Sequence, residues 1–431
     1  MGLFDQDFVV VQNQISALLL NVFSWLQSTF PFVKFLPSPT PPLSLSPGEH
    51  RCLTINRPGG LEQLVTRPLL PHEATQGYNV QLNTPITTFN INTIPCDSVV
   101  LDISHTSINF ADVTIRWGLY ESALRFVGWP IVPGFDISGT VAAVNATKNE
   151  TNFLVGDRVY GATLFGGYSS RCIVPSNQLR TIPKSITNAV AASIPAVAFT
   201  ALHSLALAGL WKNFTPGKQT CILVHSASGG VGSSIVKMAK LLQIEGLVIV
   251  GVVGRDAKID FCKNCGADIV VSKENNATSW VDVVRREAAG NGGYNAIFDA
   301  NGLSTIQTSY DLLRMTGRLV IFGFASNIPQ AKSFLSPLSW ATMILGMLRM
   351  PTFDPMKLTL ESKSVLGFNL SFFVTEKELV GVYFEQIQKW LIEAKLEFDQ
   401  PTVFKFDEIG KAHELIQSGR SVGKIVIEVI S

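Results

Sequence analysis

Charged residues are scarce in this sequence. They make up 16% of the 431 residues, against 46% hydrophobic residues, and the 34 basic side chains are nearly balanced by 33 acidic ones. The resulting net charge of +1 gives no electrostatic basis for binding a polyanion, so we expect no nucleic-acid partner. The length exceeds what one hydrophobic core usually organises, and we expect at least two domains.

Cysteine is also scarce, and its six residues are scattered. They form no disulfide framework, which favours reduced thiols and a cytoplasmic protein. Cys262 and Cys265 form a C-x-x-C pair, but no second pair or nearby histidine completes a zinc site. This pair therefore predicts no metal centre.

No segment is apolar throughout the roughly 20 residues that a membrane-spanning helix needs. An N-terminal stretch, residues 8–36, has apolar residues at helical spacing but is interrupted by asparagine and glutamine. Because it lacks a basic polar face, we expect a helix packed on the protein body or on a second subunit. A peripheral membrane contact through residues 8–36 is the alternative. Several prolines then predict a stiff linker, which ends the extension at residue 48.

Two different sequence patterns follow the linker. From Arg51 to about Thr181, short apolar runs broken by glycine, proline and asparagine predict a β-rich domain. From about Ala189, strands alternate with helices, which predicts a doubly wound parallel sheet. The β-rich runs are Ser98–Ile103, Ile137–Val144, Asp157–Tyr160 and Ser170–Val174. The later strands are Cys221–His225, Leu247–Val253, Ile269–Val271, Ala296–Asp299 and Arg318–Phe322. The later helices are Gly232–Leu242, Ala257–Cys265, Ser279–Ala288, Ser304–Met315 and Glu376–Leu396.

A glycine-rich turn joins the first of these strands to its helix. It follows the pattern G-x-G-x-x-G, with Ala227 in the first position and then Gly229 and Gly232. Small residues let backbone amides approach a dinucleotide diphosphate, which lies on the positive end of the following helix. The predicted cofactor-binding residues of this turn are Ala227, Ser228, Gly229, Gly230, Val231 and Gly232.

The end of the second strand predicts which dinucleotide binds. NAD enzymes usually carry an acidic residue there, which accepts a hydrogen bond from the ribose 2′-hydroxyl. Here Gly254 replaces the acid, and Arg255 and Lys258 follow it. Both cations can pair with a 2′-phosphate, although Asp256 lies between them. We therefore predict NADPH as the cofactor.

Further short motifs lie along the chain in a fixed order. They are Ser107–Asp112, Arg116–Tyr120, Pro133–Gly139, Gly156–Val159, Phe165–Tyr168, Phe199–Ala201, Ala227–Gly232, Phe353–Pro355 and Gly367–Leu370. Together they resemble the motifs of the zinc-free quinone reductases in the medium-chain dehydrogenase/reductase superfamily. The last two are similar to the branch named after the synaptic-vesicle amine-transport membrane protein. The resemblance extends from about residue 51 to residue 431.

This resemblance implies an α/β protein in which a GroES-like catalytic domain is interrupted by a Rossmann domain. We expect the N-terminal extension at 1–48, the catalytic domain at 49–188, the NADPH-binding Rossmann domain at 189–369, and a return to the catalytic domain at 370–431. It further implies hydride transfer to a small apolar carbonyl or quinone, in a homodimer. An enoyl-thioester or alkenal reductase would use the same hydride geometry.

The resemblance also bears on the catalytic residues. Zinc-dependent relatives place a metal-binding cysteine at Asn109 and Gly-His-Glu at Gly134–Asp136, so no metal is expected here. Asn109 is the candidate for contacting nicotinamide or the substrate carbonyl, with loop capping as the alternative. Many quinone reductases carry a tyrosine at the position of Thr114, which leaves Tyr120 as the second candidate, with Tyr168 as an alternative to it. Three more residues are expected to line the cofactor site, namely Thr200, Gly323 and Phe324.

A second function remains open. The same fold could serve as a non-catalytic NADPH-binding protein, associated with membranes or handling lipids. The apolar stretch Leu338–Leu348 and the N-terminal extension fit that reading. They fit equally well a subunit interface or a lid over an apolar pocket.

Overall fold

The fold is that of a computed structural model, which describes residues 49–70, 73–74, 97–145, 153–211, 220–274, 279–328 and 336–429. The expected N-terminal extension and its proline-rich linker lie outside these residues. Among the described residues, none of the helices has the length and apolar character needed to cross a bilayer.

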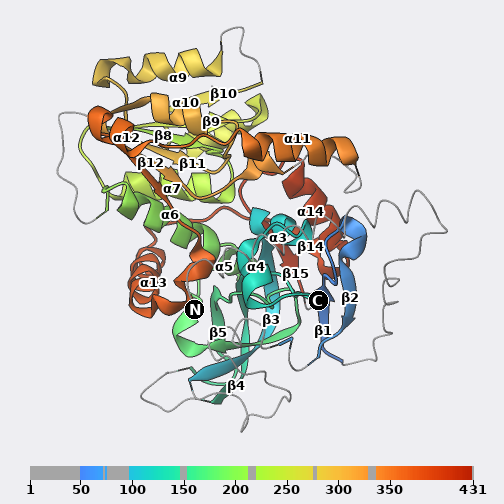
Figure 1. The fold of residues 1–431 in the computed structure, drawn as a ribbon. Helices are drawn as coiled ribbons and strands as arrows, with labels where there is room; N and C mark the ends of the chain where they lie inside the picture. The colour runs from blue at the N-terminus through green and yellow to red at the C-terminus, as the bar shows by residue number, and fades with distance from the viewer. Residues whose placement is uncertain are drawn as a thin grey trace.

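Six parallel strands form one sheet, in the order β10-β9-β8-β11-β12-β13 (Figure 1). In chain order these are the third, second, first, fourth, fifth and sixth strands, the order of a dinucleotide-binding Rossmann sheet. The predicted doubly wound sheet is therefore confirmed. The strands are β8 (Thr220–His225), β9 (Leu247–Val253), β10 (Ile269–Ser272), β11 (Tyr294–Asp299), β12 (Leu313–Ile321) and β13 (Ser364–Gly367).

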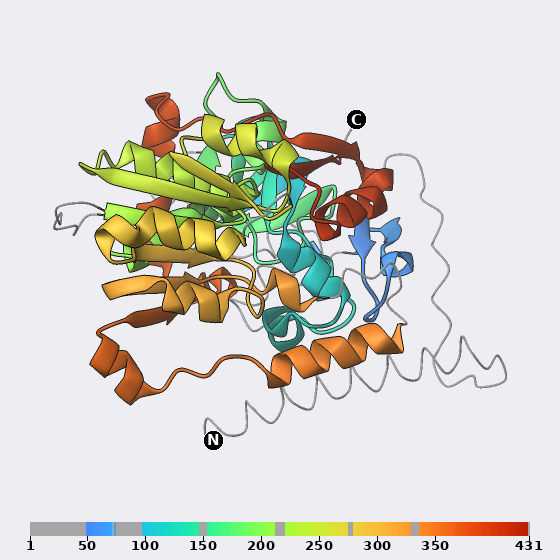
Figure 2. The ribbon, with the colours of Figure 1, turned by 90° about the horizontal axis from the view of Figure 1, so that it is seen from above.

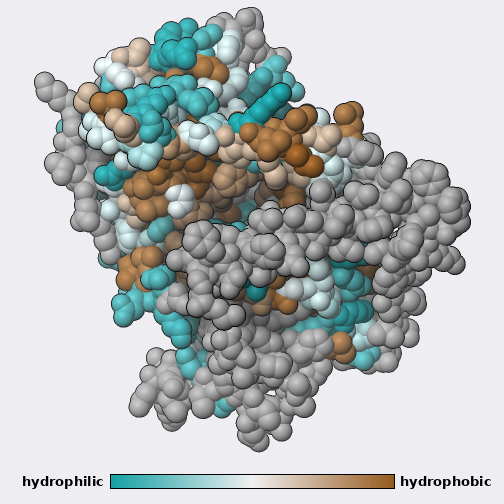
Figure 3. Space-filling view, in the orientation of Figure 1, coloured by the Kyte–Doolittle hydropathy of each residue, from teal (hydrophilic) through white to brown (hydrophobic). Residues whose placement is uncertain are grey.

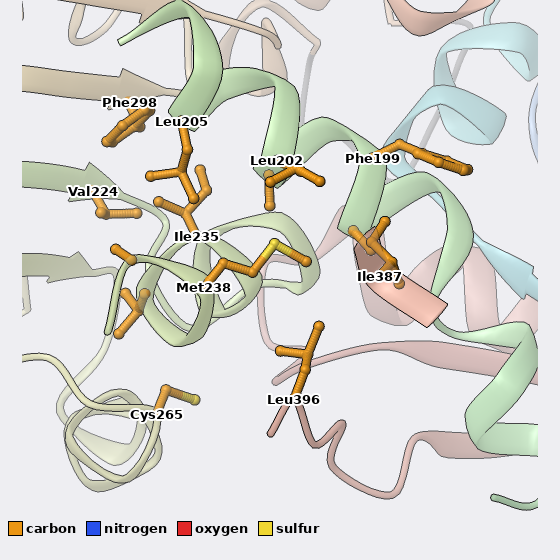
Figure 4. Packing of buried hydrophobic residues seen from close by; sticks show 14 of the residues in the cluster. Phe199, Leu202, Leu205, Val224, Ile235, Met238, Cys265, Phe298, Ile387 and Leu396 are labelled. Atoms are coloured by element: carbon orange, nitrogen blue, oxygen red, sulfur yellow. The ribbon is translucent and has the colours of Figure 1, made fainter. Parts of the chain in front are cut away.

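Helices cover both faces of this sheet, because alternate residues of each buried strand point to opposite sides. On β8, Ile222 and Val224 face a core built with α6 and α7, whereas Cys221 and Leu223 face a second core under α9 and α10. Figure 4 shows how side chains from α6 and α7 meet Val224. The helices in this part of the chain, including some that lie away from the sheet, are α6 (Pro195–Leu207), α7 (Gly230–Leu241), α8 (Ile259–Asn264), α9 (Trp280–Ala288), α10 (Ile306–Asp311), α11 (Pro337–Leu348), α12 (Pro355–Glu361) and α13 (Lys377–Ile392).

The second sheet has seven strands and is mainly antiparallel. Its path runs β14-β15-β3-β4-β5-β7, with β6 paired to β3, and a separate hairpin joins β1 and β2. The last strand of the chain, β15, pairs with β3, so the C-terminal segment returns to this sheet. The strands are β1 (Arg51–Thr54), β2 (Val65–Pro68), β3 (Ser98–Ile108), β4 (Asp136–Asn145), β5 (Arg158–Ala162), β6 (Arg171–Pro175), β7 (Leu179–Thr181), β14 (Thr402–Lys405) and β15 (Ile425–Glu428).

Short helices connect the strands of the β-rich sheet and carry several candidate residues. They are α3 (Phe110–Arg116), α4 (Glu121–Phe126), α5 (Asn188–Ala192) and α14 (Ile409–Gln417). Seven 3₁₀ turns complete the secondary structure of the described residues: Leu61–Gln63, Ser176–Gln178, Asp256–Lys258, Ala289–Asn291, Ala325–Asn327, Leu370–Thr375 and Phe406–Glu408.

The predicted helix Ser304–Met315 is wrong at its C-terminal end. The helix stops at Asp311, and Leu313 already begins β12, where it is buried and pairs with Tyr294 of β11. Sheet pairing overrides local helical spacing here because it buries apolar side chains. The predicted helix Glu376–Leu396 likewise ends early, at Ile392, and Ala394 then adopts a left-handed conformation that an α-helix cannot continue.

A pair of glycine substitutions tests the packing of β3 against β4. A Cβ at Gly139 would overlap the carbonyl oxygen of Asp102 on β3. We expect Gly139→Ala to destabilise the protein by about 1–3 kcal/mol through overpacking. The control, Gly381→Ala in α13, has no atom within 4 Å of the new Cβ and should stabilise by about 0.5–1 kcal/mol. Urea-unfolding midpoints measure both; an unchanged midpoint for Gly139→Ala contradicts the close approach.

Candidate active site

The glycine-rich turn lies at the carboxyl end of β8 and leads directly into α7. Ser226 has a positive φ of 50°, and the Gly229 amide donates to its carbonyl at 2.9 Å. A Cβ at Gly232 would overlap that same carbonyl oxygen, so only glycine lets the first turn of α7 approach the strand so closely. The predicted residues from Ala227 to Gly232 are therefore together at one edge of the sheet.

The N-terminus of α7 is suited to bind an anion. Gly229 is its N-cap and provides no side-chain cap, and the first turn contains no acidic residue. Backbone N–H groups in the first turn of a helix lack intrahelical partners, and the helix dipole makes this end positive. A phosphate group at this position would meet both features.

The second strand, β9, ends next to two exposed residues, Gly254 and Arg255. Nothing lies within 4 Å of a Cβ placed on Gly254, so this position is open to the solvent. Lys258, in contrast to Gly254 and Arg255, does not point into solvent. Its ammonium is partly buried and donates to the carbonyls of Gly419 at 2.8 Å and Ser421 at 2.6 Å. Burial lowers the pKa of Lys258. Of the two predicted cations, Arg255 is thus the one that faces outward.

The C-terminal return brings a lysine onto the glycine-rich turn. Gly423, just before β15, donates its amide to the Ser228 carbonyl at 2.9 Å. The methylenes of Lys424 lie over Gly230, where a Cβ would be 2.8 Å from Lys424 Cδ. The ammonium of Lys424 then reaches the β-rich domain and donates to Asn109 Oδ1 at 2.7 Å. This lysine therefore contacts the turn and a predicted catalytic residue at once.

Asp136 completes this contact from β4. Its Oδ2 accepts from Ser107 Oγ, from Asn109 Nδ2 at 2.9 Å and from Lys424 Nζ at 3.3 Å. Its Oδ1 accepts from the Ala196 amide, in the first turn of α6, at 2.6 Å. The carboxylate is fully buried, and burial also lowers the pKa of Lys424. One carboxylate thus ties the β-rich sheet to the helix that leads into the Rossmann sheet.

Asn109 is the N-cap of α3, and its backbone amide donates to Asp112 Oδ2 at 2.8 Å. Asp112 also accepts from the Gly134 amide at 3.0 Å. Desolvation raises the pKa of the Asp112 carboxyl to about 7, even though these two amides favour its charged form. Asp112 therefore fixes the loop conformation around Asn109, whose own side chain is held between Asp136 and Lys424.

Tyr120 lies at the start of α4 with its ring edge-on to Phe135. Its hydroxyl donates to Asn369 Oδ1 at 3.1 Å and lies 2.7 Å from Ser371 Oγ, and burial raises its pKa. Tyr168 is completely buried, with its hydroxyl 3.3 Å from His413 Nε2. Tyr168 is therefore a core residue, whereas Tyr120 joins α4 to the segment after β13.

The three remaining predicted residues lie on two elements. Thr200 is in α6, one turn after Ala196, and its hydroxyl donates to the Ala196 carbonyl at 2.7 Å. Gly323 and Phe324 follow β12, and the Phe324 side chain is half exposed. They lie at the same sheet edge as the glycine-rich turn, where a hydrogen bond of 2.8 Å from Ser226 Oγ to Asn301 joins the ends of β8 and β11.

Two residues of this arrangement were not predicted. Lys424 directly precedes the apolar strand Ile425–Glu428. A charged residue beside an apolar strand is a signal in the sequence that could have marked it. Asn301 follows β11 at the carboxyl edge of the sheet, where ligands bind in open α/β folds. Within the described ranges, no group of three or more histidine, cysteine, aspartate or glutamate side chains is arranged to hold a metal ion.

Two family descriptions match the chain. Residues 96–184 match the alcohol dehydrogenase GroES-like domain, and residues 230–383 match the zinc-binding dehydrogenase domain. A probable quinone oxidoreductase of Schizosaccharomyces pombe is 26% identical over 335 residues, which cover 77% of this chain and 88% of that protein. The human synaptic vesicle membrane protein VAT-1 homolog is 25% identical over 381 residues, covering 88% of this chain and 86% of that protein.

Solved structures share the fold. Escherichia coli quinone oxidoreductase complexed with NADPH superimposes with a TM-score of 0.67 at 21% identity, covering 88% of this chain and all of that chain. The human VAT-1 homolog-like protein superimposes with a TM-score of 0.65 at 20% identity, covering 89% of this chain and 99% of that chain. A mycobacterial protein complexed with NADPH gives 0.67 at 23% identity, covering 88% of this chain and all of that chain.

Removing the ammonium of Lys424 tests the buried contact. Lys424→Met leaves the Asp136 carboxylate buried beside no cation, and we expect a loss of about 3–5 kcal/mol in the free energy of unfolding. Lys424→Met combined with Asp136→Asn should recover much of that loss. The control is Lys240→Met, which breaks a solvent-exposed pair with Asp268 and should cost less than about 1 kcal/mol. Similar small losses at both lysines would refute the coupling.

Proposed function

Because the chain belongs to the quinone oxidoreductase family of the medium-chain dehydrogenase/reductase superfamily, we propose that it is a zinc-independent, NADPH-dependent reductase. Its acceptor is a quinone or an α,β-unsaturated carbonyl. The observation that carries the proposal is the contact between the glycine-rich turn and Asn109 through Lys424. A dinucleotide on this turn would have its reactive end beside hydrogen-bond donors from the other domain.

The residues at the turn fit NADPH. The uncapped N-terminus of α7 suits the diphosphate, with the residues from Ala227 to Gly232 around it. The exposed Arg255 suits the 2′-phosphate, next to Gly254, which offers no carboxylate to a free 2′-hydroxyl. Lys258 supports this region because its ammonium donates to carbonyls of the loop before β15. The NADPH complexes of the bacterial neighbours support the same choice.

NADPH, when bound, supplies the hydride, and the protein must stabilise the negative charge that develops on the acceptor oxygen. Asn109 donates one N–H of its amide to Asp136 and can present the second N–H to that oxygen. Lys424 lies 2.7 Å from this amide, and its lowered pKa makes its ammonium a better proton donor than a lysine in water. Both groups are already oriented by Asp136, so they need little reorganisation during the reaction.

The acceptor is proposed to bind among aromatic side chains. Tyr120 and Phe135 form one wall, and the half-exposed Phe324 another. Thr200 and Gly323 would line the nicotinamide side. Flat apolar rings and conjugated carbonyls suit such walls better than charged substrates do.

Zinc independence rests on the residues at the metal-binding positions of the zinc-dependent relatives. Asn109 and Phe135 replace the cysteine and histidine that bind zinc there. Neither offers the thiolate or imidazole that zinc prefers. The Asn109 amide is instead engaged by Asp136 and Lys424.

We also propose a cytoplasmic homodimer, with the domain boundaries at 188/189 and 369/370. The thiols support the location, because five cysteines are buried and unpaired. The Rossmann sheet ends at β13, an edge strand that a second copy could extend.

The choice of NADPH over NADH can be tested on one residue. Arg255→Ala removes the cation proposed for the 2′-phosphate, so the Kd for NADPH should rise about 10- to 100-fold while the Kd for NADH changes little. Tryptophan quenching measures both constants. Lys263→Ala, at an exposed position on α8, is the matched control and should change neither. Equal losses for both cofactors in Arg255→Ala would argue against the 2′-phosphate assignment.

The reductase activity is tested by NADPH oxidation against quinones, enones and alkenals. We expect turnover with one acceptor class, and Asn109→Ala should lower kcat about 10²- to 10³-fold with little change in NADPH affinity. Circular dichroism checks that the variant folds. Tight NADPH binding without turnover on any acceptor would instead favour a non-catalytic, membrane-associated or lipid-handling protein of the same fold.

A further inference from the structure

α11 exposes an apolar surface that nothing in the described residues covers. This helix contains no charged residue, and Leu338, Leu345 and Leu348 are 75%, 51% and 79% exposed. With Ala341 and Ile344, these side chains fall within an arc of about 120° at 100° per residue. We call these five residues the α11 stripe. Figure 3 shows hydrophobic side chains gathered where α11 lies in Figure 1.

The opposite face of α11 fixes its orientation. Met343 is buried, and the ring of Trp340 packs on Trp117, just after α3, with centroids 5.6 Å apart. In Figure 2, α11 runs alongside the helices of the β-rich domain. The α11 stripe therefore points away from the protein core. A contiguous exposed apolar surface of this kind marks an interaction site.

The sequence contains a second apolar stripe with matching character. Between residues 8 and 33 there is no charged residue. Ile15, Leu18, Leu19, Val22 and Leu26 recur at intervals of three and four, which places them on one face of a helix. A second amphipathic helix is the kind of partner that an exposed apolar helix face accepts.

The described chain comes close to α11 within its first eleven residues, Glu49 to Gly59. The Gly59 amide donates to the Arg116 carbonyl at 2.9 Å, and the next residue, Trp117, packs on Trp340 of α11. Residues 27–48 can span up to about 70 Å at roughly 3.3 Å per residue. The 12 residues of α11 are about 18 Å long. The connection is therefore long enough for the first apolar segment to reach every part of α11.

We propose that residues 15–26 form a helix that packs on the α11 stripe of the same molecule. Tethering favours this partner over a second copy, because a linker long enough to span the two sites makes docking intramolecular and so raises the effective concentration of the segment. A membrane surface is disfavoured by charge. Neither residues 8–33 nor α11 carries a basic residue, so anionic lipid would gain no electrostatic attraction.

Cross-linking of the full chain tests the contact directly. In a Cys96→Ser background, Leu19→Cys and Leu345→Cys should be joined within one chain by a short bismaleimide. Five native cysteines are buried, and burial raises their pKa, so they react slowly.

Two matched pairs are controls. Ser24→Cys with Leu345→Cys moves the first site to the other helix face, and Leu19→Cys with Met356→Cys moves the second to exposed α12.

The expected result is intramolecular product at least about tenfold faster than in either control pair, identified by peptide mass spectrometry. Product between two chains would show a second copy on the stripe and overturn the proposal. Product that disappears when phosphatidylcholine vesicles are added, with the protein in the vesicle pellet, would assign the stripe to a lipid surface instead. Equal rates in all three pairs would mean that the segment does not dock.

A second readout needs no cross-linker. Leu345→Asp with Leu348→Asp charges the stripe at two exposed positions, which leaves the core intact. We expect chymotrypsin to cut after Trp25, which lies inside residues 15–26, about tenfold faster than in the unmodified chain, because a docked segment is protected and a released one is not. The control Met356→Asp should leave the cleavage rate unchanged. Unchanged cleavage in the double variant as well would contradict docking, whatever the enzymatic activity proves to be.

Discussion

The buried pair of Lys424 and Asp136 lies in the β-rich half, at the place where that half contacts α6 and the glycine-rich turn of the Rossmann half. Taking two charges out of water costs several kcal/mol for each ion, so such a pair persists only where further hydrogen bonds satisfy it. Here Asn109 bridges the pair, and the Ala196 amide accounts for the remaining carboxylate oxygen. The position of Asn109, of the glycine-rich turn and of α6 relative to one another follows from this contact.

The return of the C-terminal segment to the β-rich sheet places Lys424 in this contact. Because β15 pairs with β3, Gly423 and Lys424 are carried onto the turn between β8 and α7. Lys424 directly precedes β15, and the pairing of that strand with β3 positions its ammonium beside Asn109 and Asp136. The site is therefore assembled from both segments of the catalytic half and from the start of the Rossmann sheet.

The sequence correctly predicts those features of the fold that depend on the spacing of residues close together in the chain. The parallel sheet follows from strand and helix periodicity, and the glycine-rich turn from the close approach that Gly232 requires. Contacts between residues far apart in the chain are different. The sequence marks Lys258 as a cation at a helix start, but its partners Gly419 and Ser421 lie more than 150 residues away. The bond from Lys424 to Asn109 spans a separation of 315 residues, which no local pattern records.

A crystal structure of the protein with NADPH and a slow acceptor analogue would test the central claim most directly. We predict that the diphosphate lies on the amides between Gly229 and Gly232, and that the acceptor oxygen lies within hydrogen-bond distance of Asn109. Lys424 would still contact Asp136. A dinucleotide bound elsewhere, or an acceptor oxygen turned away from Asn109 and Lys424, would contradict it.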